Sequence, residues 1–167
     1  MDQSLLLVKI AGETAALDSA RIQSVVELEA LTPVPCSPPH VAGLAALRSR
    51  AMTVIDCRRS LELPDSEDRI DDGAGALAVV VELDEFLYAL LVDQVEEVVP
   101  LEGEPALLRT ELLPGWARTT QGMVETSAGP ALLLDPAQLV AGPDDTLGHA
   151  VEKAMAYSNV DPKRVSQ

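Results

Sequence analysis

Short apolar runs and turn-forming residues alternate along most of this chain, and that pattern is typical of a mainly β protein. Most runs are almost continuously apolar rather than alternating. In an antiparallel protein this indicates strands covered on both faces, as where two small barrels pack together. The expected strands are residues 5–10, 15–17, 22–28, 44–47, 52–57, 76–83, 86–92, 95–101, 122–125 and 130–134.

Two of the turns between these strands can be predicted from their residues. The hairpin joined at Asp84-Glu85 is the clearest, and Ala11-Gly12-Glu13-Thr14 is expected to turn a second one. Short helices are expected at 38–42, 58–63 and 136–140.

Two segments differ from this pattern. Residues 65–75 are rich in Asp, Glu and Gly, which favours a solvated loop over a calcium site, because the spacing does not fit an EF-hand. From Gly142 onward the character changes, and 146–156 has apolar residues at helical spacing. We therefore expect one domain over 1–141, followed at 142–167 by a helical or partly disordered tail for docking or partner binding.

The charge balance excludes several classes of function. The net charge is −15, with 27 acidic residues against 12 Lys and Arg, which argues against binding to nucleic acids or anionic membranes. No signal peptide and no apolar run of membrane-spanning length is recognisable. Cys36 and Cys57 are not in a C-x-x-C spacing, so two free thiols are expected. The expected location is the cytoplasm.

The stretch 31–64 joins a stiff proline-rich segment to a group of arginines. Arg48, Arg50, Arg58 and Arg59 form a local basic group on an acidic chain, which favours docking to an acidic partner surface. The alternative is that they pair with nearby acids, for which the candidates are Glu62, Asp65 and Glu67.

The sequence gives little support for catalysis or for a metal or cofactor. His40 and His149 are far apart and are expected to be ordinary surface histidines. No phosphate-binding or nucleophile-elbow motif is present. Asp56, Asp93 and Asp135 each follow an apolar strand, where capping of a following turn or helix is the expected role.

The order of the motifs resembles that of the CheW-like domain family of bacterial chemotaxis, over roughly residues 4 to 140. The stretches that carry the resemblance are IQSVVEL, VPCSPPHVAGLAALRS, AMTVIDCRR, ALLVDQVEEVV and ALLLDPAQLV. The resemblance implies two intertwined SH3-like five-stranded β-barrels sharing a hydrophobic interface, with no catalysis. It also implies an adaptor between the regulatory domain of the CheA histidine kinase and the cytoplasmic tips of chemoreceptors, located at membrane-associated receptor arrays.

Four positions depart from the family pattern. Ser24 stands where the family has a glutamate on a partner-binding surface, and Ser49 where it has the glycine of L-R-G. Thr53 replaces a proline and Cys57 a leucine. Loss of the glycine removes easy access to positive φ, so a changed backbone path is expected there.

The resemblance assigns expected roles to particular residues. Arg48 matches the L-R-G arginine and is expected to contact a partner or to order the loop; the alternative is an internal pair with Asp56 or Glu27. Gly43 is assigned to close packing or turn geometry. The residues expected at partner-binding surfaces are Ile22, Ser24, Val25, Val26, Arg48, Ser49, Arg50, Val92, Asp93 and Val95.

Core positions are the alternative for the apolar residues in this set. Three functions remain: the adaptor, a diverged CheW-like regulator binding another signalling or polarity protein, and an enzyme on a β scaffold.

Overall fold

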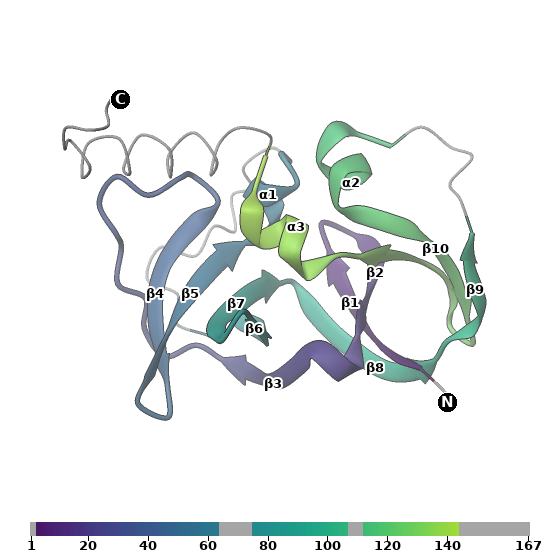
Figure 1. The fold of residues 1–167 in the computed structure, drawn as a ribbon, viewed down its shortest axis with the longest axis horizontal. Coiled ribbons are helices and arrows are strands. Elements are labelled where there is room, and N and C mark those ends of the chain that lie inside the picture. Colours follow the sequence, from purple (N-terminus) through teal and green to yellow (C-terminus); the bar gives the residue numbers. More distant parts are fainter. Residues whose placement is uncertain (1–2, 64–74, 107–111, 144–167) are drawn as a thin grey trace, which may run out of the picture.

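The computed structural model describes residues 3–63, 75–106 and 112–143, and these form two mixed β-sheets with short helices between them (Figure 1). The six-stranded sheet has the order β8-β1-β2-β11-β10-β9. Its strands are β1 (Ser4–Ile10), β2 (Glu13–Asp18), β8 (Gln94–Pro100), β9 (Glu102–Ala106), β10 (Thr120–Thr126) and β11 (Gly129–Leu134).

The five-stranded sheet has the order β3-β6-β7-β5-β4 and uses the middle of the chain. Its strands are β3 (Ile22–Glu27), β4 (Val41–Leu47), β5 (Arg50–Asp56), β6 (Leu77–Leu83) and β7 (Phe86–Val92). The helices are the 3-10 turn η1 (Ser19–Arg21), α1 (Cys57–Ser60), α2 (Pro114–Thr119) and α3 (Pro136–Ala141).

The two halves of the chain are intertwined. The N-terminal hairpin β1–β2 belongs to the sheet built from the C-terminal half, because β1 pairs antiparallel with β8 and β2 pairs parallel with β11. In the other sheet, β5 pairs parallel with β7. The mainly β expectation is confirmed, with sheets of five and six strands rather than five and five.

Three tight hairpin turns have two consecutive residues at positive φ. These are Ala11-Gly12 between β1 and β2, Arg48-Ser49 between β4 and β5, and Asp84-Glu85 between β6 and β7. Two-residue turns of this kind match the right-handed twist of the strands they join. The predictions at Ala11-Gly12 and Asp84-Glu85 are confirmed.

Most expected strands are present, with bounds that differ by a few residues. The helix expected at 38–42 is wrong: the chain turns there, with Val41 N bonded to Pro38 O at 2.9 Å, and β4 begins at Val41. The helix expected at 58–63 is shorter and lies at Cys57–Ser60. Strand β9 and helix α2 were not expected. The tail helix and most of the acidic loop lie outside the described residues.

The buried side chains form three clusters. One lies between the sheets and the helices and includes Ile55, Leu90 and Trp116. A second, with Met52 and Leu87, is made mostly by side chains of the five-stranded sheet, and a third by side chains of the six-stranded sheet. Because β6 and β7 contribute alternate residues to the first two clusters, both faces of these strands are covered, as their continuous apolar runs predicted.

The three α-helices meet at a polar junction between the sheets (Figure 1). Arg118 of α2 donates to Gln138 O of α3 at 2.5 Å and to Ser60 O of α1 at 2.7 Å. Ser60 Oγ donates to Leu139 O at 2.7 Å. A cation thus lies at the C-terminal carbonyls of two helices, where the helix dipoles favour it.

His40 is fully buried beside this junction, so the surface location expected for it is wrong. Its Nε2 lies 2.8 Å from Val140 O and therefore carries the proton that is donated. Gly142, at φ 82°, packs directly against the ring, leaving no room there for a Cβ atom. His149 lies outside the described residues.

Candidate functional site

Strand β5 separates the four arginines that the sequence groups together. Arg48 and Arg50 lie at its first end, in and next to the β4–β5 turn, whereas Arg58 and Arg59 follow its last residue and belong to α1. Arg58 pairs with Asp93 at 2.7 Å, and Arg59 pairs with Asp56 at 3.7 Å. The expectation of one basic docking group is therefore wrong. These two pairs use Asp93 and Asp56, whereas Asp65 and Glu67 of the alternative lie outside the described residues.

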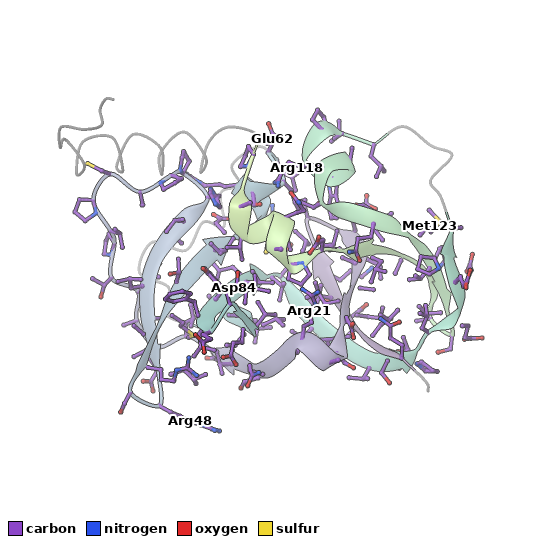
Figure 2. The ribbon with its side chains drawn as sticks, viewed as in Figure 1. Arg21, Arg48, Glu62, Asp84, Arg118 and Met123 are labelled. Atoms are coloured by element: carbon purple, nitrogen blue, oxygen red, sulfur yellow. The ribbon has the colours of Figure 1, made fainter. Side chains whose placement is uncertain are left out.

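Arg48 projects from the tip of the β4–β5 hairpin into solvent (Figure 2). Among the described residues it makes no ion pair or hydrogen bond, so neither Asp56 nor Glu27 pairs with it. Asp56 lies at the opposite end of β5, where its Oδ1 accepts from Arg59 N at 3.3 Å. Within the part of the chain that the structure describes, the guanidinium of Arg48 therefore uses none of its donors.

Ser49 adopts φ 71° and Arg48 φ 50°, both in the left-handed region. The turn therefore has two residues at positive φ without a glycine at either position, and a backbone path different from that of the family stays a prediction. The serine carries the conformational strain that glycine avoids. Beside it, Arg50 Nη2 donates to Glu85 O at 3.3 Å, joining the β4–β5 hairpin to the neighbouring β6–β7 hairpin.

Asp93 is exposed, and its carboxylate is bonded within the chain at the junction of the two sheets. Its Oδ2 accepts from Ala11 N at 2.7 Å and from Arg58 Nη2 at 2.7 Å, while its Oδ1 accepts from Arg58 Nε at 3.3 Å. Val92 is buried in the central cluster and Val95 packs against it. Val92, Asp93 and Val95 therefore all make contacts within the chain that hold the fold together.

Strand β3 distributes its apolar residues over both faces of the sheet. A bulge between Ile22 and Ser24 changes the register, so Ile22 packs on the central cluster while Val26 packs on the core of the five-stranded sheet. Ser24 is half-buried opposite Val80, and Val25 is 42% exposed. Val25 is thus the apolar residue of this strand that is open to a partner.

Gly43 has the packing role expected of it. At φ 153°, the position of a Cβ atom would overlap the carbonyl oxygen of Thr32, which crosses the edge of β4. Thr32 and Leu44 exchange two backbone hydrogen bonds, of 2.9 and 2.8 Å. The glycine therefore lets the segment after β3 cover part of the β4 edge.

The strand-end carboxylates cap turns and helices. Asp56 and Asp135 cap α1 and α3 as predicted, with Asp135 Oδ1 accepting from Ala137 N at 3.0 Å. The Asp93 carboxylate instead accepts a hydrogen bond from the backbone N–H of Ala11, which lies in a turn far back in the chain. Burial raises the pKa of the Cys57 thiol, and Asp56 and Asp93 act in the same direction. Cys57 is therefore not a nucleophile at neutral pH.

Within 3–63, 75–106 and 112–143, no group of three or more His, Cys, Asp or Glu could hold a metal ion. Nor does that part of the chain contain a helix long and apolar enough to cross a bilayer.

Sequence reasoning missed Phe86, which follows the Asp84-Glu85 turn and is 66% exposed. It is the chain's one phenylalanine and was predicted only as the start of a strand. Arg118 was also missed, because its contacts are backbone carbonyls of two distant helices.

Comparisons with known proteins show which family has this architecture. The model of the CheW-like domain family matches residues 4–143. The chain is 20% identical over 132 residues to the chemotaxis protein CheW of Treponema pallidum (strain Nichols), covering 78% of each chain. The crystal structure of the scaffolding protein TtCheW from Thermoanaerobacter tengcongensis superposes with a TM-score of 0.67 at 22% identity, covering 81% of this chain and 90% of that one.

The matched residues include every described strand and helix, from β1 to α3. The polar contacts at the helical junction and between the sheets join distant elements and stabilise the fold. This chain belongs to the CheW-like domain family, a family of non-enzymatic scaffolds.

Proposed function

We propose that this protein is a chemotaxis adaptor that couples the cytoplasmic tips of chemoreceptors to the regulatory domain of a CheA-type histidine kinase. The family match over residues 4–143 supports the adaptor role, and the relatives are named as chemotaxis and scaffolding proteins. In this role the protein acts in the cytoplasm, at membrane-associated receptor arrays. No cofactor or metal is required for this role.

The observation that carries the proposal is the state of Arg48. An exposed arginine on a tight turn, with no internal partner in the described residues, has its donor groups free to bind a carboxylate in two-point geometry. The turn is short and bonded to its neighbour through Arg50, so little conformational freedom is lost on binding. Ser49, Arg50 and Val25 are also exposed positions of the expected partner-binding set, as is Asp93, whose carboxylate is paired with Arg58.

The other members of that set have a smaller share in the proposed contacts. Ile22, Ser24 and Val26 are half-buried and Val92 is buried, while Val95 and Asp93 already have partners within the chain. Changes at these six positions should act mainly through the stability of the fold.

The test is a calorimetric titration of the full chain against the CheA regulatory domain from the same cell. We expect saturable binding in the micromolar range, weakened by added salt because Arg48 and Arg50 contribute charge. Arg48→Ala should weaken binding about tenfold, and Arg48→Lys should restore it only in part. Arg21→Ala is the matched control, since Arg21 is also an exposed arginine but lies beside β3. Equal effects of Arg48→Ala and Arg21→Ala would remove Arg48 from the binding surface.

A diverged regulator that binds another signalling or polarity protein is the second candidate. The observation in its favour is Ser24, which occupies a half-buried position on β3 where the family pattern has a charged glutamate. No heat and no co-elution with the kinase domain would select this candidate, and partners would then be isolated from cells.

A further inference from the structure

The five-stranded sheet has an outer face that is open along half its length. Met52 and Leu87 are a directly opposed pair in the β5–β7 ladder, and both point into the core of this sheet. Their neighbours Ala51 and Phe86 therefore point to the other side, because side chains alternate along a strand. Farther along the same side, Ile55 and Leu90 are buried in the central cluster.

Two cross-strand rows make up the open half. One runs through Leu44, Thr53 and Tyr88, of which Thr53 and Tyr88 are half-buried. The next holds the pair Ala46 and Ala51 and, one residue before Leu87 on the adjoining strand, Phe86. We call these six residues the outer face. Phe86 is 66% and Leu44 39% exposed, and both alanines are exposed. The outer face contains no charged residue, in a chain with 27 acidic ones. An apolar surface of this kind is typical of the centre of a protein interface.

Both signs of charge border the outer face at the hairpin tips. The β4–β5 turn carries Arg48 and Arg50, and the neighbouring β6–β7 turn carries Asp84 and Glu85. All four are exposed, and the two turns are joined by the hydrogen bond from Arg50 to Glu85 O. The border is therefore locally neutral, whereas the molecule as a whole carries −15.

A surface with an apolar centre and equal numbers of positive and negative charges at its border is complementary to itself. In a two-fold dimer every contact between the two copies occurs twice. The arginine turn of each copy can therefore face the acidic turn of the other. Elsewhere, two copies with −15 each would repel one another, and a neutral apolar face avoids that repulsion.

We propose that the outer face binds a second copy of this chain, with Phe86 as the apolar anchor and Arg48 opposite Asp84 of the other copy. The tight turns at positive φ hold the border residues in place before contact, which reduces the entropy lost on association. Because Arg48 also belongs to the proposed kinase contact, a second copy and the kinase domain would compete for the β4–β5 turn.

The experiment is sedimentation equilibrium of the full chain, from low to high micromolar concentration, at about physiological ionic strength so that the net charge is screened. The average mass should rise with concentration. Phe86→Arg should weaken dimerisation at least tenfold. The control is Val98→Arg, which adds the same side chain at a valine that is 61% exposed on the other sheet and should leave dimerisation unchanged.

Charge reversal tests the pairing itself. Arg48→Glu and Asp84→Arg should each weaken self-association by about tenfold, because each places like charges together. An equimolar mixture of the two variants should associate more tightly than either alone, since every pair in the mixed dimer is again of opposite sign.

A chain that stays monomeric at every concentration, or an equal effect of Phe86→Arg and Val98→Arg, would overturn the proposal. So would a mixture no tighter than its components. Since no kinase domain is present in these measurements, their failure would leave the proposed adaptor function standing. Loss of kinase binding in Phe86→Arg with a monomeric wild type would assign the outer face to that partner instead.

Discussion

Arg58 Nη2 lies 2.7 Å from Asp93 Oδ2, and this pair joins the helix after β5 to the residue between the two sheets. The same carboxylate oxygen accepts from Ala11 N in the β1–β2 turn. One side chain therefore connects the end of the five-stranded sheet, the start of β8 and the N-terminal hairpin.

Replacing Asp93 by Ala should destabilise the fold by about 1–2 kcal/mol, because charge-assisted hydrogen bonds to both Arg58 and Ala11 N are lost. Denaturant unfolding of the full chain measures this. A double-mutant cycle with Arg58→Ala isolates the ion pair; fully additive effects would show that Asp93 acts only through Ala11.

Arg118→Ala should lower the free energy of unfolding by about 2–3 kcal/mol, because carbonyls of α1 and α3 lose a charged donor. Arg118→Lys should recover only part of the loss, since one ammonium cannot reproduce a planar fork. Arg21→Ala serves as the control for loss of an arginine and should be close to neutral. If Arg118→Ala were as mild, the junction would not depend on this side chain.

His40 should make the fold sensitive to acid. Burial lowers the pKa of the imidazole below its ordinary 6.5; Arg118 acts in the same direction, and the bond to Val140 O and the carboxylate of Asp56 oppose it. Below pH 6.5 the unfolded chain therefore binds a proton that the folded chain resists, so stability falls as pH falls through this range. Chemical denaturation at a series of pH values should show this slope.

The matched variant for that experiment is His40→Phe, which keeps an aromatic ring against Gly142 but cannot titrate. It should have a shallower dependence on pH between neutral and mildly acidic conditions. Identical slopes for the two proteins would mean that His40 does not account for the acid sensitivity.

Gly43→Ala should destabilise the chain by about 2–3 kcal/mol, because the added methyl group overlaps Thr32 O and the backbone is at positive φ. Gly12→Ala is the control: it has positive φ but nothing within contact distance, so only about 1 kcal/mol should be lost. Thermal unfolding of the two variants separates the steric overlap with Thr32 from the backbone strain that both variants share. Equal losses of stability would show that the overlap has no effect.

The central strands could be predicted from the sequence because both of their faces are buried. The hairpin at Asp84-Glu85 is an example, where two continuous apolar runs flank a two-residue turn. Strand β9 was missed because all its residues are exposed and it lies at the edge of its sheet beside β10, so no apolar pattern marks it. Helix α2 begins at Pro114-Gly115, which resembles a turn.

The site was harder to predict because its contacts join residues far apart in the chain. His40 looks like a surface residue after two prolines, but its ring is buried and bonded to Val140 O, 100 residues later. Arg58 is close in sequence to Arg48, yet β5 carries it to the opposite end of the sheet. The β4–β5 turn has Arg48 and Ser49 at positive φ without a glycine, and the flanking strands and the hydrogen bond from Arg50 to Glu85 O hold it.

The sharing of strands between the halves of the chain sets an order of events during synthesis. All strands of the five-stranded sheet lie between Ile22 and Val92, so this sheet can assemble while the later residues are still being added. The β1–β2 hairpin cannot find its permanent neighbours until β8 and β11 have emerged. Until then its most apolar strand is exposed, which makes the nascent N-terminal hairpin the segment most in need of chaperone protection.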